Sequence, residues 1–257
     1  MTAVAAVVSG LLGLYVGTYL NLLIDRVPEK QPVGPVRPGC RRCLGGPDRE
    51  GRLALAPWMR WRGRCPSCGE PVTFRYALVE VATAGLFAAA AVRLGLDSAL
   101  PAYLVLFACL LAVSVIDLEH QIIPNRIVYP TILLSLPLLA AASLAKGDLG
   151  RLGTALIGGA IAFGALLVVH LVSPAGMGFG DVRLAFVLGL FLGWLSLGHV
   201  VLGLFLGFAL GAVVGVALVV LGRRGRKDSV PFGPFLAGGA ALAVLVGQPL
   251  LNWWLRT

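Results

Sequence analysis

The sequence is poor in charged side chains for a chain of 257 residues. Asp, Glu, Lys and Arg together make up 13% of it, whereas a soluble globular domain carries about a quarter. Hydrophobic residues make up 58%, which also excludes a disordered chain. No internal repeat with inverted halves is recognisable, and this disfavours a secondary transporter. The composition therefore indicates a protein that crosses the membrane several times.

Uncharged runs predict where the chain crosses the membrane, because a spanning helix needs roughly 20 apolar residues. The run 184–222 has 39 residues, too long for one span, and is expected to divide near residues 196–199. The run 152–180 predicts a helix to about Val172 and then a loop over 173–180. The predicted fold is an all-α membrane bundle of about eight transmembrane helices. The uncharged runs are 3–24, 77–92 (broken only by Glu80), 98–116, 127–145, 152–180, 184–222 and 229–255.

Lys and Arg residues predict the orientation, because they collect in cytoplasmic loops. With the N-terminus outside, the segment 25–76 lies in the cytosol with 11 basic residues, and the loop 223–227 adds four. Arg126 and Arg183 lie in two further inner loops, so this orientation puts 17 basic residues inside and four outside. It leaves both termini outside. The net charge of +9 is then explained by topology and by contact with membrane lipid, so we expect no nucleic-acid partner.

Four of the five cysteines form two pairs in the predicted cytosolic segment. Cys40 and Cys43 make one C-x2-C pair, and Cys65 and Cys68 make a second, with 21 residues between the pairs. Four thiolates in this pattern are typical of a structural zinc site, and the reducing cytosol argues against stable disulfides. The predicted domains are a first transmembrane helix (1–24), a zinc-binding insert (25–76) and a seven-helix membrane domain (77–257).

Three acidic residues are predicted at the cytosolic face of the membrane. Asp117 ends the third span, Asp181 starts the sixth, and Glu80 lies near the end of the second. Ionisable groups at membrane depth are functional candidates. Two carboxylates that meet there would share a proton, so one could activate water while the other protonates a carbonyl oxygen. The alternative is structural: either Asp could cap a helix or pair with Arg126 or Arg183.

The motifs resemble the bacterial type IV prepilin peptidase / N-methyltransferase family over the whole chain. Residues 178–181 read GFGD, which is similar to the GxGD motif of membrane aspartic proteases. The other similar segments are GTYLN (17–21), RVP (26–28), the two cysteine pairs, PVTFRY (71–76) with VE (79–80), Asp117 with IP (123–124), and PFGPF (231–235). Two positions depart from the family pattern: Arg183 replaces a usual Lys, and Asn125 replaces a common Asp.

The resemblance implies an enzyme of the bacterial cytoplasmic membrane that removes the leader peptide of prepilin or pseudopilin precursors at the cytosolic face. It also implies N-methylation of the new N-terminus with S-adenosylmethionine as cofactor. Asp117 and Asp181 would be the catalytic pair. Gly178, Gly180 and Glu80 would bind the substrate, with the glycines letting the backbone approach an extended peptide.

Two other functions stay open from the sequence. Acidic residues at the membrane edge also suit a proton-coupled transporter of small solutes. The basic cysteine-containing insert could alternatively form a membrane-anchored zinc module that binds nucleic acid or a partner protein. Glu80 could hold a positive group of the substrate or pair with Arg75.

Overall fold

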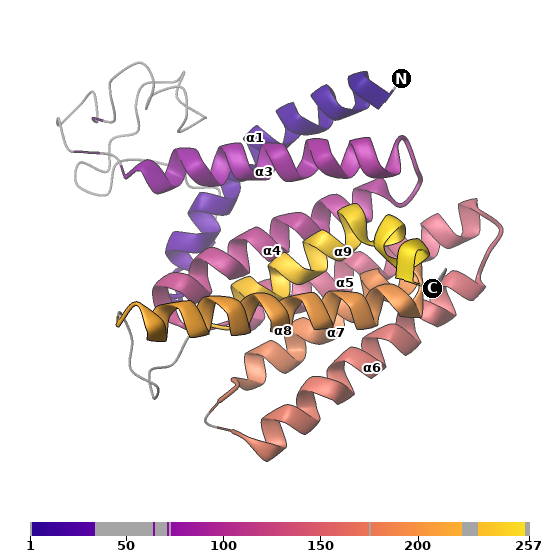
Figure 1. Cartoon of the computed structure of the whole chain (residues 1–257). Coiled ribbons are helices and arrows are strands. Elements are labelled where there is room, and N and C mark those ends of the chain that lie inside the picture. The colour runs from indigo at the N-terminus through magenta and orange to yellow at the C-terminus, as the bar shows by residue number, and fades with distance from the viewer. Residues whose placement is uncertain are drawn as a thin grey trace. The chain divides into compact units, whose positions relative to one another are not determined.

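The computed structural model describes residues 2–33, 64, 71, 73–174, 176–222 and 231–254. Eight α-helices account for most of these residues, and the one extended pairing among them is an isolated antiparallel bridge between Arg64 and Pro71. The helices, labelled in Figure 1, are α1 (Thr2–Arg26), α3 (Phe74–Leu94), α4 (Leu100–His120), α5 (Asn125–Ala145), α6 (Gly150–Val172), α7 (Phe179–Leu195), α8 (Leu197–Val220) and α9 (Gly233–Trp254).

These helices confirm the eight predicted from the uncharged runs. Seven of the helices in the described ranges are long and apolar enough to cross a membrane. The eighth, α7, has 17 residues, slightly fewer than a full span requires. The chain is therefore an all-α, polytopic membrane protein. The zinc-binding insert that we predicted falls largely outside the described residues, which include none of its four cysteines.

The predicted division of the run 184–222 occurs at Ser196. This residue is extended between α7 and α8, and its hydroxyl accepts a hydrogen bond from the backbone N–H of His199 at 3.4 Å. A serine in this position satisfies one of the free N–H groups at a helix start. The predicted loop over 173–180 begins where expected, because α6 ends at Val172, but it is two residues shorter than predicted, because α7 begins at Phe179.

The chain divides into two compact units, Met1–Leu100 and Pro101–Thr257. In the first unit α1 packs along α3, and glycines on α1 allow the two backbones to come close. A Cβ on Gly13 would lie 2.7 Å from the Cα of Ala84, which leaves no room for any larger residue. A Cβ on Gly17 would lie at the same distance from the Cα of Glu80, so α1 passes close to the backbone of Glu80.

The second unit is built around α7. This helix packs against α5, α6, α8 and α9, and 12 of its 17 residues are buried. Its closest neighbour is α6, which runs beside it in Figure 1. A Cβ on Gly189 would lie 2.3 Å from the carbonyl oxygen of Gly158, and a Cβ on Gly193 would lie 2.5 Å from that of Thr154. The short helix that carries Asp181 is therefore held by direct backbone contact.

Glycines at every fourth residue of α8 mostly serve packing inside this unit. Gly203 and Gly207 face α9, where a Cβ on Gly239 would lie 2.3 Å from the backbone nitrogen of Gly207. Gly211 lies against the ring of Phe232, whereas Gly215 has open space around it.

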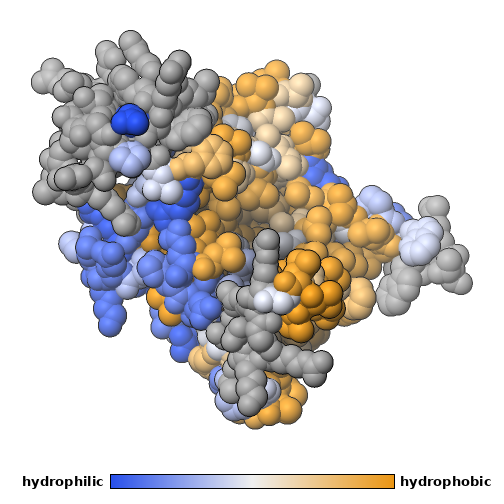
Figure 2. All heavy atoms as spheres, turned by 60° about the vertical axis from the view of Figure 1, so that its left-hand side comes forward, coloured by the Kyte–Doolittle hydropathy of each residue, from blue (hydrophilic) through white to orange (hydrophobic). Residues whose placement is uncertain are grey.

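Exposed apolar side chains cover the outer surface of several helices. On α8 alone, Val201, Phe205, Val213, Val216 and Val220 are all more than 60% exposed. Figure 2 shows broad apolar areas on the visible face. Such a surface is unfavourable in water, so these side chains suit contact with lipid tails.

We predict that Gly189→Ala destabilises the protein. The new methyl group would meet the Gly158 carbonyl, and overpacking of this kind costs about 1–3 kcal/mol, more than the helix-propensity gain of about 1 kcal/mol. The thermal midpoint of the detergent-purified protein should fall. Gly164→Ala on α6 is the matched control, because nothing lies within 4 Å of the added Cβ. An unchanged midpoint for Gly189→Ala would mean that the two backbones are not in contact.

Candidate active site

Asp117 lies in the last turn of α4 and is buried, with 5% of its surface exposed. Its Oδ2 accepts a hydrogen bond from the backbone N–H of Gly233 at 2.9 Å. Gly233 is the first residue of α9, so the carboxylate lies at the start of a 22-residue helix. The free N–H groups at a helix start carry partial positive charge, which suits an acidic side chain.

Asp181 is the third residue of α7 and is also buried, with 7% of its surface exposed. Its Oδ1 has no hydrogen-bond partner among the described residues. The charge of Asp117 acts directly on Asp181. The structure therefore brings together the two aspartates that the sequence singled out, although 64 residues separate them along the chain.

Neither aspartate forms an ion pair with a described residue. Arg183, one of the two expected partners, donates a hydrogen bond to the side-chain oxygen of Asn125 and lies 4.6 Å from the ring centre of Phe179. The structural alternative holds only in one respect, because Asp117 does cap a helix, namely α9. Two buried carboxylates without a counter-ion are costly, and such costs are usually found where chemistry requires them.

The glycines before Asp181 shape the start of α7. A Cβ on Gly180 would lie 2.8 Å from the Cβ of Ile123, in the connection between α4 and α5. Gly178 has an extended backbone and precedes the helix, and a Cβ there would make an ordinary contact with Oδ2 of Asp181 at 3.5 Å. Packing against Ile123 thus accounts for the absence of a side chain at Gly180.

A second set of contacts holds the segment that leads into α7. Nδ1 of His170, at the end of α6, lies 2.7 Å from the carbonyl oxygen of Met177. The same imidazole ring lies 5.6 Å from the ring of Phe179, centre to centre. His170 therefore acts as a hydrogen-bonded packing residue in this structure.

Glu80 belongs to the first unit and is fully buried in α3. Its Oε1 accepts a hydrogen bond from the hydroxyl of Thr18 on α1 at 2.7 Å. One turn away, the side-chain amide of Asn21 donates to the carbonyl oxygen of Tyr76 at 3.0 Å. Thr18 and Asn21 both lie in the GTYLN segment, so that motif supplies the polar contacts between the two helices.

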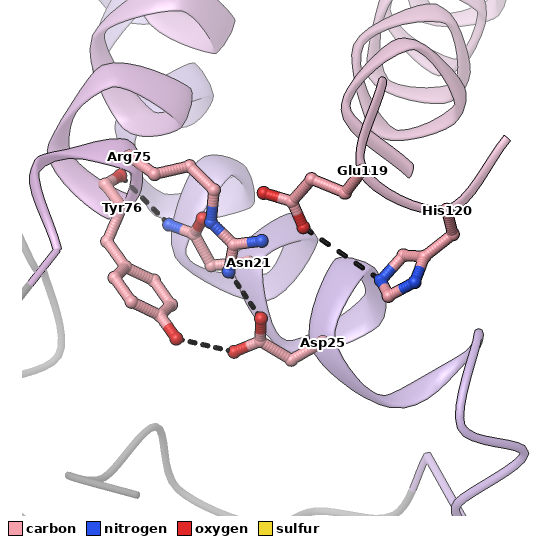
Figure 3. Close-up of polar contacts among 6 residues, drawn as sticks. All are labelled: Asn21, Asp25, Arg75, Tyr76, Glu119 and His120. Atoms are coloured by element: carbon pink, nitrogen blue, oxygen red, sulfur yellow. Dashed lines mark hydrogen bonds and ion pairs between the residues drawn. The ribbon is translucent and has the colours of Figure 1, made fainter. Parts of the chain in front are cut away.

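Sequence reasoning missed a polar cluster at the ends of α1 and α3. Asp25 forms an ion pair with Arg75 and accepts a hydrogen bond from the hydroxyl of Tyr76 at 2.7 Å, as Figure 3 shows. The guanidinium of Arg75 also lies 4.8 Å from the centre of the Tyr76 ring. Arg75, considered as a partner for Glu80, thus pairs with Asp25. The cluster ties together the two ends of the insert.

Figure 3 also labels Glu119 and His120, in the last turn of α4. Oε2 of Glu119 lies 4.0 Å from Nε2 of His120. This pair follows Asp117 by two and three residues in the sequence.

The predicted metal ligands Cys40, Cys43, Cys65 and Cys68 lie outside the described residues. Within the residues that are described, no three His, Cys, Asp or Glu side chains come together as a metal site would require. The remaining cysteine, Cys109, is buried in α4.

Comparison with known families assigns both parts of the chain. The model of the type IV leader peptidase family matches residues 104–216, which include Asp117 and Asp181. The model of the bacterial peptidase A24 N-terminal domain matches residues 11–94, which include Glu80. No solved structure matches the chain.

Similar proteins are found in several bacteria under the name prepilin leader peptidase/N-methyltransferase. The protein of Bacillus subtilis (strain 168) is 32% identical over 244 residues, covering 95% of each chain. The protein of Aeromonas hydrophila is 31% identical, covering 95% of this chain and 92% of its own. That of Myxococcus xanthus (strain DK1622) is 36% identical, covering 95% and 73%. The chain is therefore an enzyme that belongs to the type IV leader peptidase family.

Proposed function

We propose that this enzyme is a membrane aspartic endopeptidase that removes the leader peptide from type IV prepilin or pseudopilin precursors. One observation carries the proposal: Asp117 and Asp181 are both buried, interact electrostatically and have no counter-ion among the described residues. A pair of carboxylates that share one proton can activate water and protonate a peptide carbonyl. Membership of the family supports leader peptides as the substrate class.

A proton-coupled transporter is not favoured. That reading rests only on acidic residues at the membrane edge, which a leader peptidase explains equally well. It gains no support from the family, whose description names a peptidase.

We place the cut at the cytosolic face of the bacterial cytoplasmic membrane, with both termini outside. The basic residues support this orientation, with 17 on the proposed inner side and four on the outer side. Asp117 ends a helix and Asp181 begins one, so both face the same side as the predicted cytosolic loops. The chain would then comprise a first transmembrane helix (1–24), a cytosolic insert (25–76) and a seven-helix peptidase domain (77–257).

Substrate contacts are assigned to Gly178, Gly180 and Glu80. The two glycines lie within three residues of Asp181 and present backbone groups beside it. Glu80 offers a buried carboxylate, which suits a positively charged group of the substrate.

The enzyme is also proposed to methylate the new N-terminus, as the names of its relatives suggest for them. S-adenosylmethionine would supply the methyl group. A nucleotide site in which a Gly-rich loop follows a strand is not found in the described part of the chain, which contains only one isolated bridge. We therefore assign no residues to this cofactor.

The insert is proposed to bind one structural zinc ion through Cys40, Cys43, Cys65 and Cys68. Two C-x2-C pairs supply the four thiolates of a closed tetrahedral site. The insert has few large apolar residues, so a metal would supply the cross-link that a small core cannot.

We predict that Asp117→Asn and Asp181→Asn each abolish cleavage. The amide keeps the shape of the side chain but can neither accept the proton of water nor donate an acidic proton, and the loss should be on the order of 10³-fold or more. The assay is the mass of a purified prepilin after incubation, with and without S-adenosylmethionine. Both variants should keep the wild-type thermal midpoint, and Asn125→Ala should still cleave. Normal cleavage by Asp181→Asn would refute the aspartic mechanism.

Zinc content gives the second prediction. Elemental analysis of the purified protein should find one zinc ion per chain. Cys65→Ser should lose the metal, because three remaining thiolates bind zinc more weakly than four. Cys109→Ser is the matched control and should retain it, since Cys109 is buried in α4. Metal-free wild-type protein with full activity would contradict the proposed site.

The orientation can be tested with an impermeant thiol reagent on intact cells. We expect no labelling from outside of a cysteine introduced at Arg224, and clear labelling of one introduced at Lys146. The first position lies in the basic loop 223–227, and the second follows the end of α5 on the proposed outer side. The reverse pattern would invert the topology and move the aspartates to the outer face.

A further inference from the structure

The two aspartates have different surroundings, although each carboxylate lies at the start of a helix: that of Asp117 at α9 and that of Asp181 at α7. Oδ2 of Asp117 accepts a 2.9 Å hydrogen bond from the Gly233 N–H, whereas Oδ1 of Asp181 is buried without a partner among the described residues. The helix start acts on both carboxylates, so it does not distinguish them. The backbone N–H groups of Gly178 and Asp181 also act on the Asp181 carboxylate. Of the backbone contacts to the two side chains among the described residues, the one from Gly233 to Asp117 has a full hydrogen-bond geometry, and a donor to a carboxylate stabilises its ionised form.

The missing side chain of Gly233 is as important as its N–H. A Cβ at this position would lie 2.8 Å from Oδ2 of Asp117 and 3.3 Å from its Cγ. Any residue other than glycine would therefore push the carboxylate away from the start of α9. The turn itself is held by Phe232, whose carbonyl accepts from the N–H groups of Phe235 and Leu236, both at 3.1 Å.

Other charged groups nearby do not compensate either carboxylate. Glu119 and His120 contact each other, Arg183 donates to an amide, and His170 binds a backbone carbonyl. None of these groups, nor Arg126, has a hydrogen bond or ion pair with either aspartate. The balance between the two therefore depends on the Gly233 contact to Asp117, on the backbone N–H groups of Gly178 and Asp181 beside Asp181, and on the mutual repulsion of the carboxylates.

Resting on the proposed cleavage function, we propose that Gly233 is a positioning residue that makes Asp117 the ionised base and leaves the shared proton on Asp181. Asp117 then takes a proton from water while the oxygen of that water bonds to the scissile carbonyl carbon. Asp181 gives its proton to the carbonyl oxygen, forming a gem-diol. In the second step Asp117 returns its proton to the leaving nitrogen, the C–N bond breaks, and Asp181 recovers a proton from one hydroxyl.

The test is Gly233→Ala, assayed for prepilin cleavage as a function of pH. We expect kcat to fall at least about tenfold with KM little changed, because the base is displaced from the reacting atoms. The acid limb of the profile should move up by about one pH unit, since a hydrogen bond to a charged group is lost.

Gly238→Ala on the same helix is the matched control. Its added Cβ would lie 3.4 Å from a flexible leucine methyl group, an ordinary contact far less severe than the one at Gly233. This variant should keep the wild-type rate and pH profile. Phe232→Leu is to be used if Gly233→Ala does not fold. It removes a ring that packs against Phe208 and Phe235 at 5.0 and 6.5 Å between ring centres, so it should displace the same turn less and shift the acid limb in the same direction by less.

Two outcomes would overturn the inference. One is Gly233→Ala with a normal rate and profile, and the other is a reduced rate with an unmoved acid limb, which would indicate general disturbance of the fold. Neither outcome affects the proposed cleavage function, which fails only if Asp117→Asn or Asp181→Asn still cleaves.

Discussion

The second unit of this protein depends on keeping two carboxylates buried beside each other in an apolar bundle. Removing a charged group from water is expensive, and a like charge nearby adds to the cost. The bundle offers no cation among its described residues to offset it. It offers the starts of two helices, α7 and α9, with Asp181 in the first turn of one and Asp117 hydrogen-bonded to the other. Backbone dipoles thus take the place of counter-ions.

Holding helix starts against an acidic side chain requires the helices themselves to be fixed within a few tenths of an ångström. Glycine contacts provide this. α7 is fixed against α6 through Gly189 and Gly193, and α9 against α8 through Gly207 and Gly239. In a membrane there is no hydrophobic force between helices, so close backbone packing is the main source of their association. The small residues along these helices therefore serve the active site indirectly, through the rigidity of the helices that carry it.

The sequence predicts this fold well because its signals are those of membrane chemistry. Uncharged runs of about 20 residues identify all eight helices, and Ser196 marks the break in the longest run through its ability to cap a helix. Asp117 and Asp181 stand out because acidic residues are rare in such a sequence. What the sequence does not reveal is the donor to Asp117. Gly233 lies 116 residues away and contributes a backbone N–H, which any residue except proline has. Only the missing Cβ distinguishes it, and the PFGPF segment was recognisable as a motif without indicating that use.

The short length of α7 bears on how water reaches the aspartates. A helix of 17 residues is about 26 Å long, while the hydrocarbon core of a bilayer is roughly 30 Å thick. One end of α7 must therefore lie inside the apolar layer unless the bilayer thins around it. The described residues before it, 173, 174 and 176–178, are not helical, and irregular backbone at membrane depth is stable only where protein or water covers it. The hydrogen bond between His170 and the Met177 carbonyl meets part of that requirement. The cover that the rest of this segment requires lies next to Asp181, where the proposed hydrolysis needs water.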